Sequence, residues 1–181
     1  MKTRPPTVGM RIIKTALAVL LTLFLTDVVL KTLLRQDYFG SLIAVIAALV
    51  TIQDTIPNSL REMKERLLST LLGCAMSIVF LWLVLNVGGA LGSDYAQRCF
   101  FYLVTGIGTI LILYICKVMR NPSIASLGVI VFVSVLFIYT EERPYIAAWV
   151  RMLETAIGCG TALAVNALIA RPKAVEKNGA S

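Results

Sequence analysis

The sequence contains no histidine, and charged residues make up only 15% of its 181 positions, compared with about 25% in soluble domains. Without histidine the chain lacks the commonest general base. No serine or cysteine stands beside another recognisable base, and there is no glycine-rich phosphate loop. We therefore predict that the protein is not an enzyme. The four cysteines lack C-x-x-C spacing, so we interpret them as packed apolar residues and expect neither a metal nor a cofactor.

The basic residues are also unlike those of a nucleic-acid-binding protein. The formal net charge is +7, but the lysines and arginines are scattered between apolar runs and form no patch with interleaved aromatic residues. We therefore predict no nucleic-acid partner.

Hydrophobic residues make up 58% of the chain. Five runs of 16 to 27 residues carry no charge, at 38–53, 67–93, 99–116, 121–140 and 155–170. About 20 apolar residues span a bilayer, and the rest of the chain is too short for a separate soluble domain of about 50 residues. The lipid bilayer is therefore the expected environment.

These runs predict an all-α membrane protein with six transmembrane helices, at residues 12–34, 39–56, 67–87, 100–116, 124–139 and 146–170. Helices are preferred over a β-barrel because the runs at 67–87 and 121–139 are apolar on every face, with no strand-like alternation. Pro57 is expected to end the second span, and residues 57–66 to form an amphipathic connector. The first span has no cleavage signal after it. A single domain at 1–171 and a short cytoplasmic tail at 172–181 follow from this division.

The distribution of lysine and arginine predicts the orientation. With the N-terminus in the cytoplasm, twelve of these residues fall on the cytoplasmic side and five on the other. The positive-inside rule then places both termini in the cytoplasm.

The two halves of the chain, at about 9–87 and 98–170, contain an internal repeat. A shift of 85 positions gives five identities in ten: Arg66, Leu68, Thr70, Gly73 and Cys74 match Arg151, Leu153, Thr155, Gly158 and Cys159. Three spans in each half give the halves opposite orientations, which predicts two inverted three-helix repeats with a substrate path near their interface.

Several residues are candidates for that path. Arg66 and Arg151 would enter the bilayer from opposite faces, either to reach the headgroups or as two cationic mouths of one anion route. Gln53 and Asp54 could bind an ion or cap the end of the second span. Small residues at every fourth position predict close packing of the third and sixth spans; they are Ser69, Gly73 and Ser77, and Ala156, Gly160 and Ala164.

Two acidic residues could couple transport to an ion. Asp27 lies in the first span, where it is either a functional carboxylate or an anchor paired with Lys31. Glu154 should meet Arg151 on one helical face, either to neutralise it or to carry a coupling proton.

The segment 9–18 (GMRIIKTALA), the segment 51–55 (TIQDT) and the residues Ser59, Leu60, Arg61, Arg66 and Gly73 together resemble the membrane domain of the bacterial aromatic acid exporter family. This family belongs to the fusaric acid resistance (FUSC-like) superfamily. The resemblance covers about residues 9–80 and implies six membrane helices, export of organic anions and a homodimer. It places Arg11, Lys14, Gln53 and Arg66 on family motif positions. Many members continue into a cytoplasmic C-terminal domain, whereas this sequence extends ten residues beyond Arg171.

We therefore expect a multi-pass protein of the bacterial plasma membrane. Its predicted function is the export or channel-like passage of small organic or aromatic carboxylates. The alternative is a membrane scaffold or partner subunit that does not transport by itself and requires a second protein.

Overall fold

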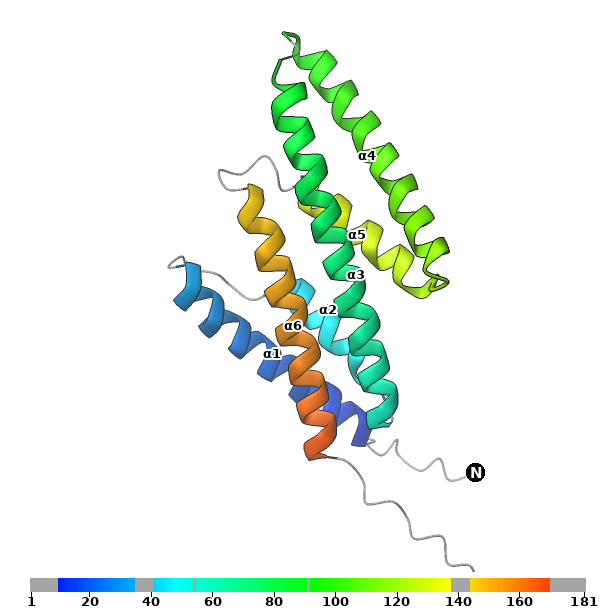
Figure 1. Cartoon of the computed structure of the whole chain (residues 1–181). Coiled ribbons are helices and arrows are strands. Elements are labelled where there is room, and N and C mark those ends of the chain that lie inside the picture. Colours follow the sequence, from blue (N-terminus) through cyan, green and yellow to red (C-terminus); the bar gives the residue numbers. More distant parts are fainter. Residues whose placement is uncertain (1–9, 35–40, 54, 91, 138–143, 170–181) are drawn as a thin grey trace, which may run out of the picture.

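The chain folds into helices throughout the part that the computed structural model describes, which is residues 10–34, 41–53, 55–90, 92–137 and 144–169, without the side chains of residues 10, 11, 33, 34 and 144. The helices are α1 (Met10–Leu34), α2 (Leu42–Thr51), α3 (Ile56–Leu83), α4 (Asp94–Val118), α5 (Ser123–Phe137) and α6 (Pro144–Leu168), and α3 continues into a π-helical turn, η1 (Val84–Gly88). The predicted all-α fold is confirmed (Figure 1).

Three of these helices are long and apolar enough to cross a bilayer: α1 over Ile12–Thr32, α3 with η1 over Ile56–Gly88, and α4 over Asp94–Val118. The helices α2 and α5 have 10 and 15 residues. At a rise of about 1.5 Å per residue they are about 15 and 22 Å long, which is less than the ~30 Å hydrocarbon core of a bilayer. The helix α2 is shorter than the span predicted at 39–56, whereas the described part of α5 covers most of the span predicted at 124–139.

The boundary between α2 and α3 also differs from the prediction. The helix α2 ends at Thr51, with Ile52 as its C-cap, so Pro57 does not end it. Pro57 instead lies in the first turn of α3, after the N-cap Thr55, whose side chain accepts a hydrogen bond from the Asn58 amide. A proline costs nothing there, because that turn has no intrahelical partner for its N–H. The expected connector at 57–66 is therefore the beginning of a continuous α3.

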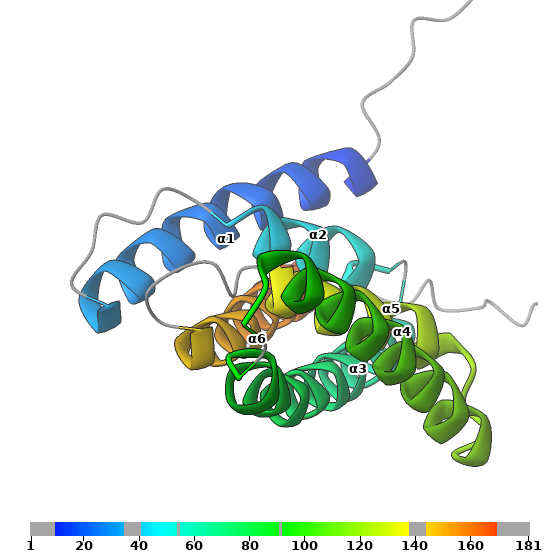
Figure 2. The same ribbon diagram turned by 90° about the horizontal axis from the view of Figure 1, so that it is seen from above.

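The helices α3 and α6 run antiparallel at the centre of the molecule, with α1 and α4 at its periphery (Figures 1 and 2). The helix α5 packs on α3, and α2 packs on α6. The beginning of α1 and the end of α6 lie at the same end of the molecule, and the turn between η1 and α4 lies at the other.

Glycines allow the closest of these contacts. A Cβ atom added to Gly73 of α3 would lie 2.6 Å from the Gly128 carbonyl oxygen of α5, and one added to Gly158 of α6 would overlap the Ala44 carbonyl oxygen of α2. Each central helix thus has one glycine against the short helix that packs on it. Close backbone approach of this kind is how helices associate in lipid.

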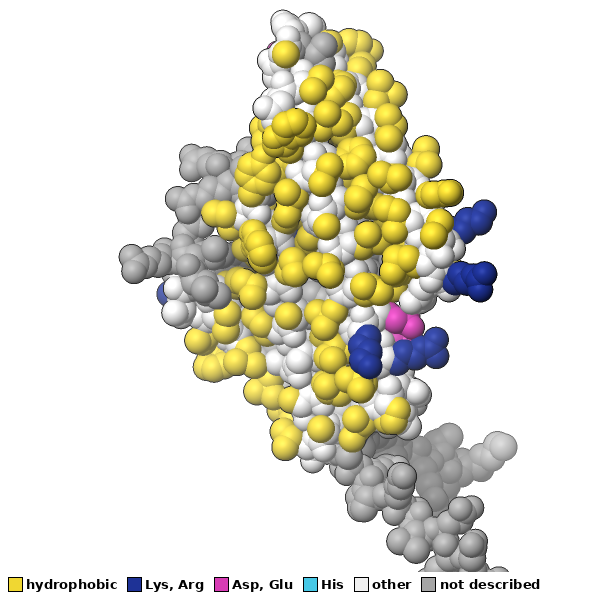
Figure 3. Space-filling model, in the orientation of Figure 1, with side chains coloured by type: hydrophobic (Ala, Val, Ile, Leu, Met, Phe, Trp, Pro, Cys, Tyr) yellow, Lys and Arg dark blue, Asp and Glu magenta, His cyan; other side chains and the backbone are white. Residues whose placement is uncertain are grey.

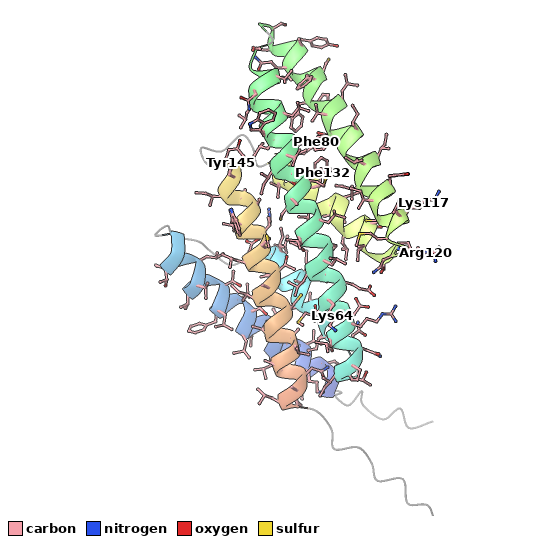
Figure 4. The ribbon with its side chains drawn as sticks, in the orientation of Figure 1. Lys64, Phe80, Lys117, Arg120, Phe132 and Tyr145 are labelled. Carbon is pink, nitrogen blue, oxygen red and sulfur yellow. The ribbon has the colours of Figure 1, made fainter. Side chains whose placement is uncertain are left out.

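The main apolar core lies between α3, α4 and α5. Phe80 and Phe132 meet edge to face with ring centroids 5.5 Å apart, and the ring of Phe132 also fills the space beside Gly108 (Figure 4). Outside this core, hydrophobic side chains cover most of the face seen in Figure 3. Lysine and arginine side chains lie at the right margin of this face and in the lower part of the face. An apolar exterior suits a protein whose solvent is lipid.

Candidate functional site

Equivalent residues of the sequence repeat meet where α3 crosses α6. The Thr70 hydroxyl donates to the Thr155 hydroxyl at 3.4 Å, and these two residues are 85 positions apart, which is the offset of the repeat. Farther along α3, the Cys74 thiol donates to the Ala148 carbonyl oxygen at 3.3 Å. Because the helices are antiparallel, the residues before Thr70 lie beside those after Thr155.

Arg66 lies one turn before Thr70, close enough to Cys159 of α6 for its charge to act on that thiol. The Arg66 side chain is partly buried. Its Nε is buried and has no hydrogen-bond partner within the described residues. A buried donor without an acceptor is costly, and more so when it carries charge. The Arg66 Nε is therefore available to donate a hydrogen bond to an anion.

Arg151 occupies the equivalent position of the second half, with its charge close to Cys74. It already has an anionic partner, because its Nη1 lies 3.2 Å from the Glu154 Oε2, and the Glu154 side chain is only 1% exposed. The residue that corresponds to Glu154 in the first half is Ser69, whose hydroxyl donates to the Arg66 carbonyl oxygen at 2.8 Å. Arg151 therefore forms an ion pair with its own helix, whereas Arg66 forms none within the described residues, although the charge of Glu62 on the same helix acts on it.

A polar cluster joins four elements near the beginning of α1. Lys14 donates to the Asn166 Oδ1 at 3.1 Å, and the Asn166 Nδ2 donates to the Gln53 carbonyl oxygen at 2.9 Å and to the Ser59 hydroxyl at 2.8 Å. The Thr51 hydroxyl donates to the Cys159 sulfur at 3.2 Å, so this cluster adjoins the surroundings of Arg66. We refer to Lys14, Gln53, Ser59 and Asn166 as the inner cluster.

Sequence reasoning found Lys14 and Gln53 but missed Asn166 and Ser59. Asn166 is 1% exposed and is the single amide side chain in the charge-free run at 155–170. A polar side chain within an apolar span needs hydrogen-bond partners. That isolation in the sequence was the available signal.

The other predicted residues are distributed more widely. The Gln53 side chain donates to the Val50 carbonyl oxygen at 3.1 Å and so covers the end of α2. Asp27 is exposed on α1. Asp54 and the side chain of Arg11 lie outside the described residues.

The two small-residue stripes take different positions. Ser69, Gly73 and Ser77 are buried in α3, whereas Ala156, Gly160 and Ala164 lie on the exposed side of α6. Within the described chain, the close contact of α6 is made by Gly158, on the face that also carries Thr155, Ala162 and Asn166.

Comparison with known proteins extends this description. The sequence model described as aromatic acid exporter family member 1 matches residues 6–88, which cover α1 to η1. The resemblance to this exporter family is confirmed over that half of the chain. Together with the long apolar helices, the match supports a membrane protein that is similar, over residues 6–88, to an exporter family.

A relative covers both halves of the chain. A UPF0421 protein of Oceanobacillus iheyensis is 24% identical over 165 residues, which is 91% of this chain and 41% of that protein. The chain thus spans about two fifths of the length of this relative. A search of solved structures found no significant match.

Proposed function

We propose that this chain transports small organic or aromatic carboxylates outward across a bacterial plasma membrane, and that the carboxylate is bound by Arg66 at the crossing of α3 and α6. The observation that carries the proposal is the buried Arg66 Nε, which lacks an acceptor within the described residues. Guanidinium groups bind carboxylates through strong charge-assisted hydrogen bonds, often two at once. Arg151 serves as an internal comparison, because Glu154 already supplies the carboxylate there.

The proposal includes six membrane crossings arranged as two inverted repeats. Three observations support this arrangement. Thr70 meets its own equivalent, Thr155. Gly73 lies against α5, and Gly158 lies in the same way against α2. Each repeat arginine acts on the cysteine of the opposite half. In transporters built in this way, the substrate site lies at the repeat interface near the middle of the bilayer.

We propose that both termini face the cytoplasm. The Ser123 hydroxyl donates to the Glu65 carboxylate at 2.8 Å, so the beginning of α3 lies beside the beginning of α5. Lys117 and Arg120 lie together on one flank of the molecule, and Lys64 lies lower, on α3 (Figure 4). The positive-inside rule assigns such a flank to the cytoplasm.

The remaining candidate residues are assigned to positions along the proposed substrate path. The inner cluster, with Arg11 and Asp54 nearby in sequence, forms the cytoplasmic mouth. Glu154 is a candidate coupling group because it is a buried carboxylate within a span, and Asp27 is a second candidate on α1. A homodimer stays part of the proposal, since Ala156, Gly160 and Ala164 give α6 an exposed stripe of small residues, which favours close packing of helices in lipid.

Flux measurements on the purified chain alone test this function. We expect proteoliposomes to release labelled 4-hydroxybenzoate or malate faster than empty liposomes. Excess unlabelled benzoate should compete, whereas benzamide, which has the same ring without the charge, should not. Absence of flux from protein with a native helical spectrum would contradict autonomous transport, and a second protein that co-purifies in fixed stoichiometry would then favour the partner-subunit alternative.

A further inference from the structure

A cavity lies away from the crossing, between η1, the first turns of α4 and the end of α5. Its volume is about 470 Å³. The lining residues that matter here are Gly88, Asp94, Arg98, Phe101, Tyr102 and Phe137. The cavity is large enough for a small organic molecule.

The cavity has a cationic group that is available for binding. Arg98 is exposed, and within the described part of the chain it forms neither a hydrogen bond nor an ion pair. Asp94, one helical turn earlier, lines the same cavity. A single basic group with an acidic neighbour favours an anion of low charge over one of high charge, because Asp94 repels every additional negative charge.

Aromatic side chains form part of the cavity wall. Phe101 and Phe137 meet edge to face with centroids 5.5 Å apart, and Phe101 and Tyr102 lie 6.0 Å apart. The Tyr102 ring is 63% exposed, so its face and edge are available to another ring. Aromatic rings prefer such edge-to-face and offset neighbours. Gly88 also lines the cavity and has no side chain to obstruct a flat ligand.

We propose that this cavity is a second binding site, which takes an aromatic monocarboxylate with its carboxylate on Arg98 and its ring against Phe101, Tyr102 and Phe137. The role of this site in transport rests on the proposed function. Its location and chemistry come from the cavity itself.

The opposite end of the molecule supports a role in a transport route. Lys14 lies near the beginning of the first half of the chain, and Arg98 lies near the beginning of the second. Lys14 is engaged by Asn166, and the inner cluster joins the helices around it. Arg98 instead lines the cavity. The basic residue near the beginning of the first half is therefore held by hydrogen bonds, whereas the one near the beginning of the second half lines a cavity.

Equilibrium binding of ring-labelled benzoate to the purified full chain tests the site. The Arg66→Gln background removes the proposed central site, so the remaining saturable binding reports on the cavity. In that background we expect Arg98→Gln to weaken benzoate binding about tenfold or more, and Asp94→Asn to strengthen it. The control Arg120→Gln removes an exposed arginine from the turn after α4 and should leave binding unchanged.

A second comparison tests recognition of the ring. Tyr102→Leu should weaken benzoate binding more than binding of cyclohexanecarboxylate, which has the same charge without aromaticity. Equal weakening of both, or benzoate binding that Arg98→Gln leaves unchanged in folded protein, would overturn the proposal. Displacement of benzoate by phosphatidylglycerol at low concentration would identify a lipid headgroup site instead and would also overturn it.

The two proposals fail separately. Loss of all benzoate binding in Arg66→Gln would refute the cavity site and leave transport through Arg66 intact. Saturable binding that depends on Arg98, in a protein without any flux, would support the cavity site and refute the transport function.

Discussion

Replacement of Gly158 by alanine tests the packing that builds the α3–α6 crossing. The new methyl group would overlap the Ala44 carbonyl oxygen and lie 3.0 Å from the Ala47 Cβ. A backbone carbonyl cannot rotate away, so α2 must shift from α6. Overpacking of this kind costs about 1–3 kcal/mol, and the gain in helix propensity from glycine to alanine returns at most about 1 kcal/mol. We expect a net loss of about 1–2 kcal/mol in the free energy of unfolding.

Gly160→Ala is the matched control. It lies two residues farther along the same helix, and an added Cβ there meets nothing within 4 Å. Within one chain it therefore keeps the propensity gain without the clash, and the comparison is made in a detergent that keeps the protein monomeric, because Gly160 also lies in the stripe proposed for the homodimer. Thermal unfolding in one detergent, followed by far-ultraviolet circular dichroism at one scan rate, should give a Tm for Gly158→Ala several degrees below that of Gly160→Ala, at about 2–4 °C per kcal/mol. Equal Tm values, or a higher Tm for Gly158→Ala, would refute the close contact between α2 and α6.

Two other predictions concern the polar groups between the helices. Asn166→Leu removes the shared partner of Lys14, Gln53 and Ser59 and should lower the free energy of unfolding by about 1–3 kcal/mol, measured by the same unfolding assay; an unchanged Tm would argue against the inner cluster. Arg151→Met should destabilise by about 3–5 kcal/mol, because it removes the cation that pairs with the buried Glu154 carboxylate, whereas Arg151→Met combined with Glu154→Met should cost less. A double variant no more stable than the single one would show that the pair does not behave as a buried ion pair.

The helices could be predicted from the sequence because an apolar segment within lipid can adopt few structures other than a helix. Every backbone group must be satisfied within the segment, so a long charge-free run such as 67–93 can be assigned without knowledge of its neighbours. The ends of α2 could not be found in this way. Residues 51–57 contain one charge, and Pro57 is compatible both with the end of one helix and with the first turn of the next. The N-cap Thr55 settles the choice, but only once the contact of its side chain with the Asn58 amide is seen.

The candidate site was predictable where the repeat made it visible. Arg66 and Arg151 stand out because they are charges at the same place in matching segments. The difference between them depends on tertiary structure, because the buried environment of the Arg66 Nε is not encoded by its neighbours in sequence. The packing face of α6 was also ambiguous. Ala156, Gly158 and Gly160 are all small, and the sequence alone does not show which of them turns towards α2.

The central claim is that Arg66, whose buried Nε has no acceptor within the described residues, binds the transported carboxylate. The most direct test is the initial rate of 4-hydroxybenzoate efflux from proteoliposomes with Arg66→Gln, Arg66→Lys and the surface control Arg120→Gln. We predict that Arg66→Gln reduces the rate about tenfold or more, that Arg66→Lys retains part of it because the charge remains without the Nε donor, and that Arg120→Gln matches the unmodified chain. Efflux from folded Arg66→Gln at the rate of the unmodified chain would contradict the claim.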